Sequence, residues 1–144
     1  MRIYLDNCCF NRPFDSQIQV RVRLETEAKL RIQERVVAGE IELAWSYILD
    51  LENAANPFEE RRAAVGMWRR RGVVDVEETP DLLDNARSLA ALGIQSKDAL
   101  HVACAVEAGC DYFVTTDDAL LKKLSGYTQI VAVDPTAFVR STEP

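Results

Sequence analysis

Five short apolar runs alternate with helical patterns along the chain, and this alternation restricts the possible fold more than any other feature of the sequence. The runs are rich in β-branched and aromatic residues, which favour strands. An alternation of strands and helices is typical of α/β folds with a mostly parallel sheet. We therefore predict an α/β fold with strands at residues 3–5, 41–45, 73–76, 112–114 and 130–133.

The segments between these runs have the periodicity of amphipathic helices. The clearest example covers residues 16–38, where apolar residues recur at steps of four and Gly39 follows at the expected stop. We expect this stripe to pack on the protein's own sheet, and a partner-binding surface is the less favoured alternative. The stripe consists of Val20, Leu24, Ala28, Ile32 and Val36, and the other predicted helices cover residues 47–55, 58–71, 81–92, 96–108 and 117–124.

Length and composition indicate one globular domain. The chain has 144 residues, of which 48% are hydrophobic, and no linker, repeat or low-complexity tract divides it. We therefore expect a single domain over residues 1–144. No apolar segment is long enough to cross a membrane, and the four cysteines lack the spacing of a metal knuckle and are expected to be reduced. These features favour a cytoplasmic protein with no membrane partner.

Four acidic residues stand where predicted strands and helices begin or end. Asp6 ends the first strand, Glu52 lies on the helix after the second strand, and Asp98 and Asp117 flank the fourth strand. Carboxylates next to buried segments are costly unless they are paired or bind a cation. In open α/β sheets, binding sites form at the carboxyl ends of the strands. The sequence therefore predicts that these four side chains can meet at one edge of the sheet.

A cluster of carboxylates with few basic neighbours suits hard divalent cations such as Mg²⁺. Such ions activate water and stabilise a leaving oxygen in phosphodiester hydrolysis. Each acid also has a simpler interpretation, because Asp98 and Asp117 suit helix starts and Glu52 suits a solvated helix surface. The prediction of a metal site therefore depends on all four acids together.

Other polar residues are weaker candidates for the site. His101 lies three positions after Asp98, on the same helix face, and could be a base or ligand, although a packed or surface histidine is favoured. Arg12, Arg61 and Arg62 are the best candidates to contact a phosphate backbone. The net charge of −6 argues mildly against a nucleic-acid partner, but bound cations would cancel part of that charge locally.

Four motifs in order resemble the PIN-domain family, and more closely the VapC-type ribonuclease toxins of bacterial toxin–antitoxin pairs. The first is an opening strand that ends in an aspartate, and the second is a serine followed six residues later by a glutamate. The third is an aspartate that opens an alanine-rich helix, and the fourth is a threonine two residues before an aspartate. The motifs are Ile3–Asp6, Ser46 with Glu52, Lys97–Ala105 and Asp111–Asp118.

This resemblance implies a three-layer PIN-like fold, in which helices flank a central parallel five-stranded sheet. It also implies a Mg²⁺- or Mn²⁺-dependent endoribonuclease that cleaves RNA as the toxin of a type II toxin–antitoxin pair. A homodimer and a small antitoxin partner are implied as well. On the matching positions, the catalytic metal-binding carboxylates are Asp6, Glu52, Asp98 and Asp117, and Thr115 supports them from the next layer of contacts.

The sequence departs from the family pattern at several positions. Asn7 follows Asp6 where many relatives have a small hydroxyl residue, and we expect its side chain to substitute for that hydroxyl. Asp50 competes with Glu52, but residues two positions apart on a helix face different ways, and we choose Glu52. Asp118 stands beside Asp117 and could supply an outer ligand.

Two other classes of function compete with this interpretation. A catalytically inactive PIN-like module would bind RNA or a protein without cleaving it, and Mn²⁺ calorimetry would distinguish it from the enzyme. A different phosphoryl-transfer enzyme is disfavoured, since Asp6-Asn7-Cys8 lacks the second aspartate of a haloacid-dehalogenase-like motif. The sequence also has no receiver-domain acid set and no glycine-rich phosphate loop.

Overall fold

A computed structural model describes the chain from Met1 to Pro144 and contains one five-stranded sheet. All strand pairs are parallel, and the strand order is β3-β2-β1-β4-β5. The predicted α/β fold and all five predicted strands are therefore confirmed, with shifts of one residue at some ends. The strands are β1 (Arg2–Leu5), β2 (Glu42–Ser46), β3 (Gly72–Val76), β4 (Tyr112–Val114) and β5 (Val131–Val133).

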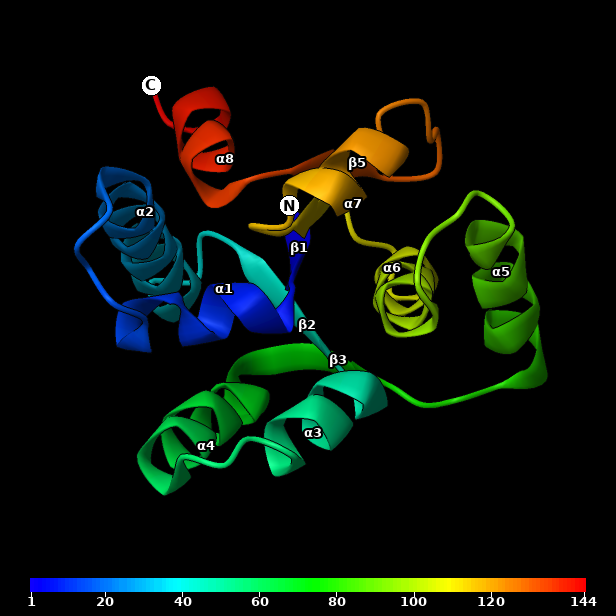
Figure 1. The fold of residues 1–144 in the computed structure, drawn as a ribbon, viewed down its shortest axis with the longest axis horizontal. Coiled ribbons are helices and arrows are strands. Elements are labelled where there is room, and N and C mark those ends of the chain that lie inside the picture. Colours follow the sequence, from blue (N-terminus) through cyan, green and yellow to red (C-terminus); the bar gives the residue numbers. More distant parts are fainter.

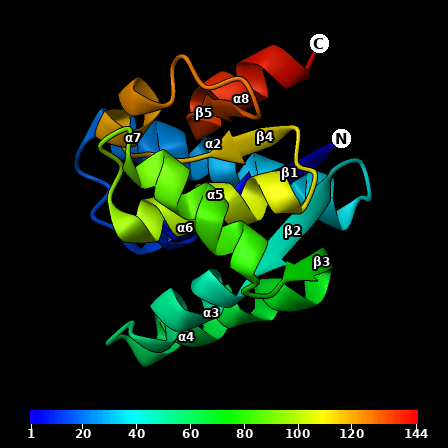
Figure 2. The same cartoon turned by 90° about the vertical axis from the view of Figure 1, so that its right-hand side faces the viewer.

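Helices cover both faces of the sheet, so the molecule has three layers (Figure 1). The helices α2 (Val20–Val37) and α8 (Pro135–Thr142) pack together on one side. The pair α5 (Pro80–Ala90) and α6 (Ser96–Glu107) covers the other side, in front of the strands in Figure 2. The remaining elements are α1 (Asn7–Asn11), η1 (Arg12–Phe14), α3 (Tyr47–Ala54), α4 (Glu59–Gly66), η2 (Met67–Arg71) and α7 (Asp118–Lys123).

The strand β1 lies at the centre of the sheet and is buried on both faces. Ile3, Tyr4 and Leu5 have at most 1% of their surface exposed, because β2 and β4 pair with β1 on its two sides and helices cover both of its faces. The buried hydrophobic core comprises 32 residues. Parallel strands that are buried on both faces read as continuous apolar runs, which is the pattern that Ile3-Tyr4-Leu5 shows in the sequence.

The helix α2 differs from the prediction in extent and in orientation. It begins at Val20 rather than at residue 16. Ala28, Ile32 and Val36 are buried as expected, but Val20 and Leu24 are 59% and 53% exposed. A step of four residues advances about 40° beyond a full helical turn, so a strict step-of-four stripe winds around the helix. The amino-terminal part of that stripe therefore leaves the core.

Several other helix boundaries also correct the prediction. The predicted helix 58–71 is two elements, because α4 ends at Gly66 and residues Met67–Arg71 form the tighter η2. The helix α7 begins at Asp118, and Asp117 is its cap. The short α1 and η1 and the helix α8 were not predicted. Isolated short helices have weak periodicity, because one or two turns show too few core positions.

Helix starts and stops follow local chemistry. Thr79 accepts a hydrogen bond from Leu82 N and precedes Pro80 in the first turn of α5, as the sequence predicts. Gly39 has φ +77° directly after α2, a conformation that side-chain-bearing residues avoid. Cys9, Cys104 and Cys110 are buried free cysteines, whereas Cys8 is only partly buried. None of the helices combines the length and apolarity that a bilayer-crossing segment needs.

Candidate active site

Asp6 and Asp117 follow two strands that are neighbours in the sheet but far apart in the sequence. The chain continues from β1 to β2 on one side, whereas β4 pairs with β1 on the other side. This arrangement is a topological switch point, where open α/β sheets form crevices beyond their carboxyl ends. A cleft of about 490 Å³ lies there, and all four predicted acids line it: Asp6, Glu52, Asp98 and Asp117.

Asp6 lines the cleft and is only 6% exposed. One carboxylate oxygen, Oδ1, accepts a hydrogen bond from Asn7 N at 2.8 Å, and the other, Oδ2, accepts one from Thr115 Oγ1 at 2.8 Å. The Cys8 thiol lies 3.5 Å from Oδ2. Asp6 is therefore oriented by the first turn of α1 and by Thr115, which follows the end of β4.

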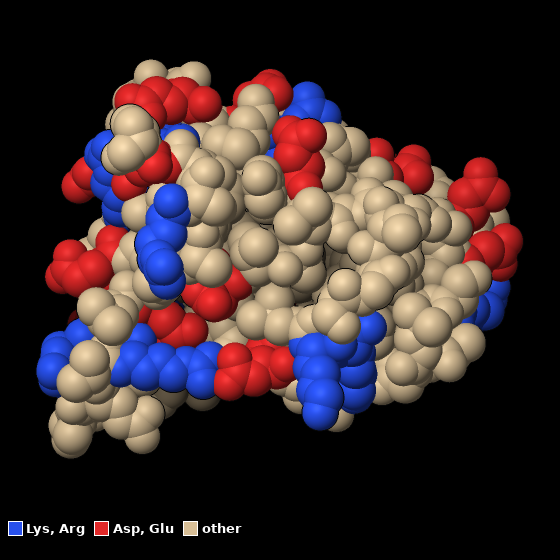
Figure 3. All heavy atoms as spheres, turned by 90° about the horizontal axis from the view of Figure 1, so that it is seen from above, with Lys and Arg blue, Asp and Glu red and all other residues tan.

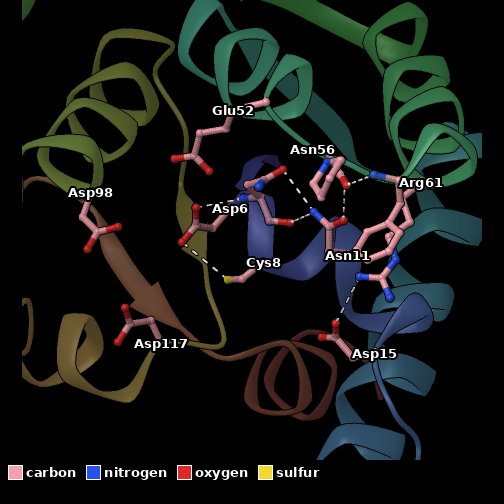
Figure 4. A pocket seen from close by; sticks show the side chains of 13 residues that line it. Asp6, Cys8, Asn11, Asp15, Glu52, Asn56, Arg61, Asp98 and Asp117 are labelled. Carbon is pink, nitrogen blue, oxygen red and sulfur yellow. Dashed lines mark hydrogen bonds and ion pairs between the residues drawn. The ribbon is translucent and has the colours of Figure 1, made fainter.

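Asp98 and Asp117 point toward the same space as Asp6 (Figure 4). Asp98 lies in the first turn of α6. Burial raises its pKa, and the neighbouring carboxylates of Asp6 and Asp117 raise it further. Asp117 caps α7 by accepting a hydrogen bond from Leu120 N at 3.1 Å. The simpler interpretation of Asp117 as a cap is therefore correct, but its side chain also lines the cleft.

Glu52 reaches the cleft from α3 and is held by His101. The distance from His101 Nε2 to Glu52 Oε1 is 2.7 Å, and His101 Nδ1 lies 2.6 Å from the Tyr4 hydroxyl. That hydroxyl is also 2.6 Å from Ser46 Oγ, which accepts a hydrogen bond from Leu49 N at the start of α3. A continuous buried network therefore connects Glu52 to the central strand.

The electrostatics of this pair favour a charged Glu52. Burial raises the pKa of Glu52, but the hydrogen bond and positive charge of His101 outweigh burial and lower the pKa overall. Burial alone lowers the pKa of His101, whereas Glu52, Asp6 and Asp98 raise it overall. His101 has no exposed surface, so it is a packed histidine, as the favoured interpretation had it. Its contact with Glu52 is what the sequence did not reveal.

The donor set of the cleft suits a hard divalent cation. Four of the carboxylates that line the cleft come from separate segments. Burial and then the neighbouring carboxylates raise the pKa of Asp98, and a cation between the acids would relieve the repulsion. No group of three or more acidic, cysteine or histidine side chains is arranged so that it could hold a metal ion through protein ligands alone. Mg²⁺ typically binds through one or two carboxylates and keeps several waters, so an open cleft of this kind fits Mg²⁺ or Mn²⁺.

Two competing acids do not line the cleft. Asp50 accepts a hydrogen bond from Trp45 Nε1 at 2.9 Å and does not line the cleft, which agrees with the choice of Glu52. Asp118 forms a bidentate pair with Arg21, with distances of 2.6 and 2.8 Å, and it does not line the cleft either. The structure therefore separates Asp117 from Asp118.

The three candidate RNA-binding arginines have different surroundings. Arg61 lines the cleft. Arg12 is paired with Asp15 and Glu25 at 3.0 Å each. Arg62 donates a hydrogen bond to Asn56 O at 2.8 Å. Since Arg12 and Arg62 do not line the cleft, Arg61 is the arginine best placed to meet a substrate there.

The side of the cleft opposite Asp98 and Asp117 was not anticipated from the sequence (Figure 4). Asn7 lines the cleft, and so do Cys8, Asn11, Asn56 and Phe58. Asn11 lies at the end of α1, a helix too short to predict, and Asn56 lies in the loop before α4. Only contacts between distant segments place these residues together, such as the 3.1 Å hydrogen bond from Asn56 Nδ2 to Asn11 Oδ1.

Comparison with solved structures relates this arrangement to known proteins. A chain of the VapBC2 complex of Rickettsia felis, solved with a DNA fragment from its promoter, superposes with a TM-score of 0.61 at 13% identity. The match covers 93% of this chain and 98% of that chain. The protein has a PIN-like fold. The resemblance inferred from the four motifs is thus confirmed in the architecture.

A second structure with a similar fold is a chain of VapBC-1 from nontypeable Haemophilus influenzae, with a TM-score of 0.53 at 14% identity. The match covers 94% of this chain and 99% of that chain. At these identities, the likeness concerns the fold. No protein-family model and no curated protein matches the sequence.

Proposed function

We propose that this PIN-like protein is a divalent-metal-dependent endoribonuclease that hydrolyses RNA phosphodiester bonds. The observation that carries the proposal is the shared cleft of Asp6, Glu52, Asp98 and Asp117 at the switch point of the sheet. These acids lie on segments that are far apart in the sequence, and capping or solvation of single residues does not explain why they line one cleft. A metal-binding phosphodiesterase site does.

In this proposal Asp6, Asp98, Asp117 and Glu52 hold the cation. When bound, Mg²⁺ or Mn²⁺ supplies an activated water and stabilises the developing charge on phosphate oxygens. The chain's own supporting residues act by orientation. Thr115 fixes Asp6 Oδ2, and His101 keeps Glu52 anionic and directed at the cleft.

Replacing Asp6 by Asn tests the proposal, because Asn keeps the size of the side chain and removes its charge. We expect Mg²⁺-dependent cleavage of single-stranded RNA by the purified protein to fall by more than about 100-fold, beyond the effect of losing a supporting contact. Asp81→Asn is the matched control, since Asp81 is exposed on α5 outside the cleft. Unchanged cleavage by folded Asp6→Asn would exclude the proposed site.

A catalytically inactive PIN-like module is the competing function, and the open spacing of the acids is the observation in its favour. Calorimetric titration with Mn²⁺ separates the two. We expect the wild-type protein to bind Mn²⁺ near neutral pH and Asp6→Asn to bind it more weakly. A folded wild-type protein that binds no Mn²⁺ would favour the module.

We further propose that the enzyme is the toxin of a type II toxin–antitoxin pair in the cytoplasm, with a small antitoxin and a homodimeric assembly. Both solved relatives are described as VapBC complexes. The exposed residues Ile18, Val20 and Leu24, at 85%, 59% and 53%, support a protein partner near the start of α2. Co-purification with the product of a neighbouring gene, followed by light scattering, tests both partners.

A further inference from the structure

An aromatic and cationic cluster stands at one side of the same cleft. The Arg61 guanidinium lies 4.6 Å from the centroid of the Phe58 ring and 5.7 Å from that of the Phe14 ring. Its Nη2 donates a hydrogen bond to Phe14 O at 2.6 Å, and Asp15 lies 3.7 Å from Nη1. These contacts hold Arg61 in place between two rings.

The Phe58 ring is not buried by this arrangement. Phe58 is 57% exposed and lines the cleft together with Arg61. The guanidinium packs against the ring, and a contact that restrains a ring before a ligand arrives lowers the entropy that binding would cost. A single exposed apolar side chain is ordinary, but an exposed aromatic ring at the mouth of a strongly polar cleft is a ready stacking surface.

A neighbouring amide adds hydrogen-bonding capacity. Asn56 Nδ2 uses one hydrogen on Asn11 Oδ1 at 3.1 Å, and Asn56 Oδ1 accepts from Phe58 N at 3.1 Å. An amide nitrogen carries two donor hydrogens and an amide oxygen two lone pairs. One donor and one acceptor of Asn56 are therefore free for the edge of a planar ligand beside Phe58.

The net negative charge of the protein limits the affinity for RNA that contacts with phosphates alone could provide. The net charge is −6, and the face in Figure 3 shows acidic and basic side chains side by side rather than a continuous basic surface. Sequence-independent binding of nucleic acid depends on neutralising phosphates. Proteins that bind single-stranded nucleic acid combine a positively charged groove with aromatic rings on which bases stack. An exposed ring beside the cleft would therefore add affinity to that of the phosphate contacts.

We propose that Phe58, Arg61 and Asn56 form a subsite for one unstacked nucleobase of a single-stranded RNA, which places an adjacent phosphate over the carboxylates. The inference rests on the proposed nuclease function, since it names the substrate class of that site. The base stacks on the Phe58 ring, and Asn56 bonds to its edge. A paired base in a duplex has both faces covered by its neighbours, so single-stranded RNA is the substrate.

The test measures binding separately from cleavage. Fluorescence anisotropy is recorded in Mg²⁺ with the Asp98→Asn protein, whose labelled RNA stays intact, alone and combined with Phe58→Ala or Phe58→Tyr. The probes are a short single-stranded oligoribonucleotide, its duplex, and an abasic oligonucleotide of the same length and charge. Met67→Ala is the matched control, because Met67 is 68% exposed and lies outside the cleft.

We expect Phe58→Ala to weaken binding of the single-stranded probe by about tenfold, the order of a lost base stack. Phe58→Tyr and Met67→Ala should bind like the parent protein. The abasic probe and the duplex should bind weakly and equally to all variants. Unchanged binding of the single strand by Phe58→Ala, equal losses on the abasic probe, or no RNA binding by the parent protein would each overturn the subsite.

The proposed function is judged by a different readout, the Mg²⁺-dependent cleavage of RNA by the wild-type protein. Phe58-dependent binding without cleavage would support the subsite and contradict the nuclease. If Phe58→Ala changed neither the cleavage of RNA nor its binding, the result would support the nuclease and contradict the subsite. The two failures are therefore distinguishable.

Discussion

His101 Nε2 lies 2.7 Å from Glu52 Oε1, while the Nδ1 atom of the same ring lies 2.6 Å from the hydroxyl of Tyr4. The histidine thus joins an acid on α3 to the central strand of the sheet. Because the ring is fully buried, the position of Glu52 in the cleft depends on a contact that no solvent molecule replaces easily.

Replacing His101 by Ala should release Glu52 and leave the Tyr4 hydroxyl without one partner. We expect RNA cleavage to fall by about 10- to 100-fold, as for other supporting contacts of metal ligands, and the free energy of unfolding to fall by about 1–3 kcal/mol. His101→Gln keeps a polar group near Glu52 and should recover part of the activity. Initial cleavage rates and urea unfolding check both effects. Full activity in His101→Ala would contradict the positioning role.

Thr115 and Thr116 form a matched pair of neighbours. Thr115 Oγ1 donates to Asp6 Oδ2 at 2.8 Å and accepts from Asp117 N at 3.2 Å, whereas the Thr116 side chain makes no hydrogen bond. Thr115→Val should therefore lower stability by about 1–3 kcal/mol and reduce cleavage by about tenfold or more. Thr116→Val should change both much less. Equal effects of the two substitutions in unfolding and cleavage assays would show that Thr115 does not orient Asp6.

Asp117 and Asp118 are adjacent but should differ sharply in function. Asp117→Asn keeps a good helix cap and removes a cleft carboxylate, so we expect a folded protein with strongly reduced cleavage. Asp118→Asn weakens only a solvent-exposed pair with Arg21, and such pairs contribute little to stability. Its activity should therefore stay close to that of the wild type. Cleavage rates of the two variants decide the matter, and a comparable loss in Asp118→Asn would place Asp118 in the site after all.

The buried ammonium group of Lys29 should make the stability of the protein depend on pH. The residue is 4% exposed and makes no hydrogen bond or ion pair, although its ammonium lies 5.6 Å from the Phe10 ring centroid and 5.9 Å from that of Trp68. Burial lowers its pKa from 10.5 to about 8, which corresponds to about 3 kcal/mol. Below pH 8 both folded and unfolded states carry the proton, so the full cost of the buried charge is present. Between pH 8 and 10.5 the unfolded state binds more protons than the folded state. The free energy of unfolding therefore increases as the pH rises through this range.

Lys29→Met removes this titrating group. The cysteines and tyrosines also titrate at high pH, but the wild type and the variant share them, so the difference in stability between the two proteins reports on Lys29 alone. We expect the variant to be about 2 kcal/mol more stable at pH 7, after allowance for the lost cation–π contacts. The advantage should shrink steadily between pH 8 and 10.5. Urea unfolding followed by tryptophan fluorescence measures the difference, and Lys122→Met, at an exposed position, is the control. An advantage that does not depend on pH would show that Lys29 is not a buried cation.

The fold and the acidic cluster were accessible from the sequence for a common reason. Short apolar runs such as Ile3-Tyr4-Leu5 report burial directly, and a carboxylate such as Asp6 at the end of a buried run is costly unless it is paired or binds a cation. The exposure of Val20 and Leu24 could not be predicted from the sequence. Residues four positions apart differ by about 40° around the helix axis, so a stripe with this step gradually turns away from the core. The polar side of the cleft was not accessible either, since Asn11 lies on a helix of five residues.

Local patterns in the sequence determined which segments become strands and helices, because burial and capping act over a few residues. They also determined that four carboxylates stand at the ends of those segments. Only the tertiary structure decided that Asp117 and not Asp118 lines the cleft, that His101 holds Glu52, and that Phe58 lines the same cleft as the four acids. Those relations depend on strand order and helix packing, which bring together side chains that the chain itself keeps far apart.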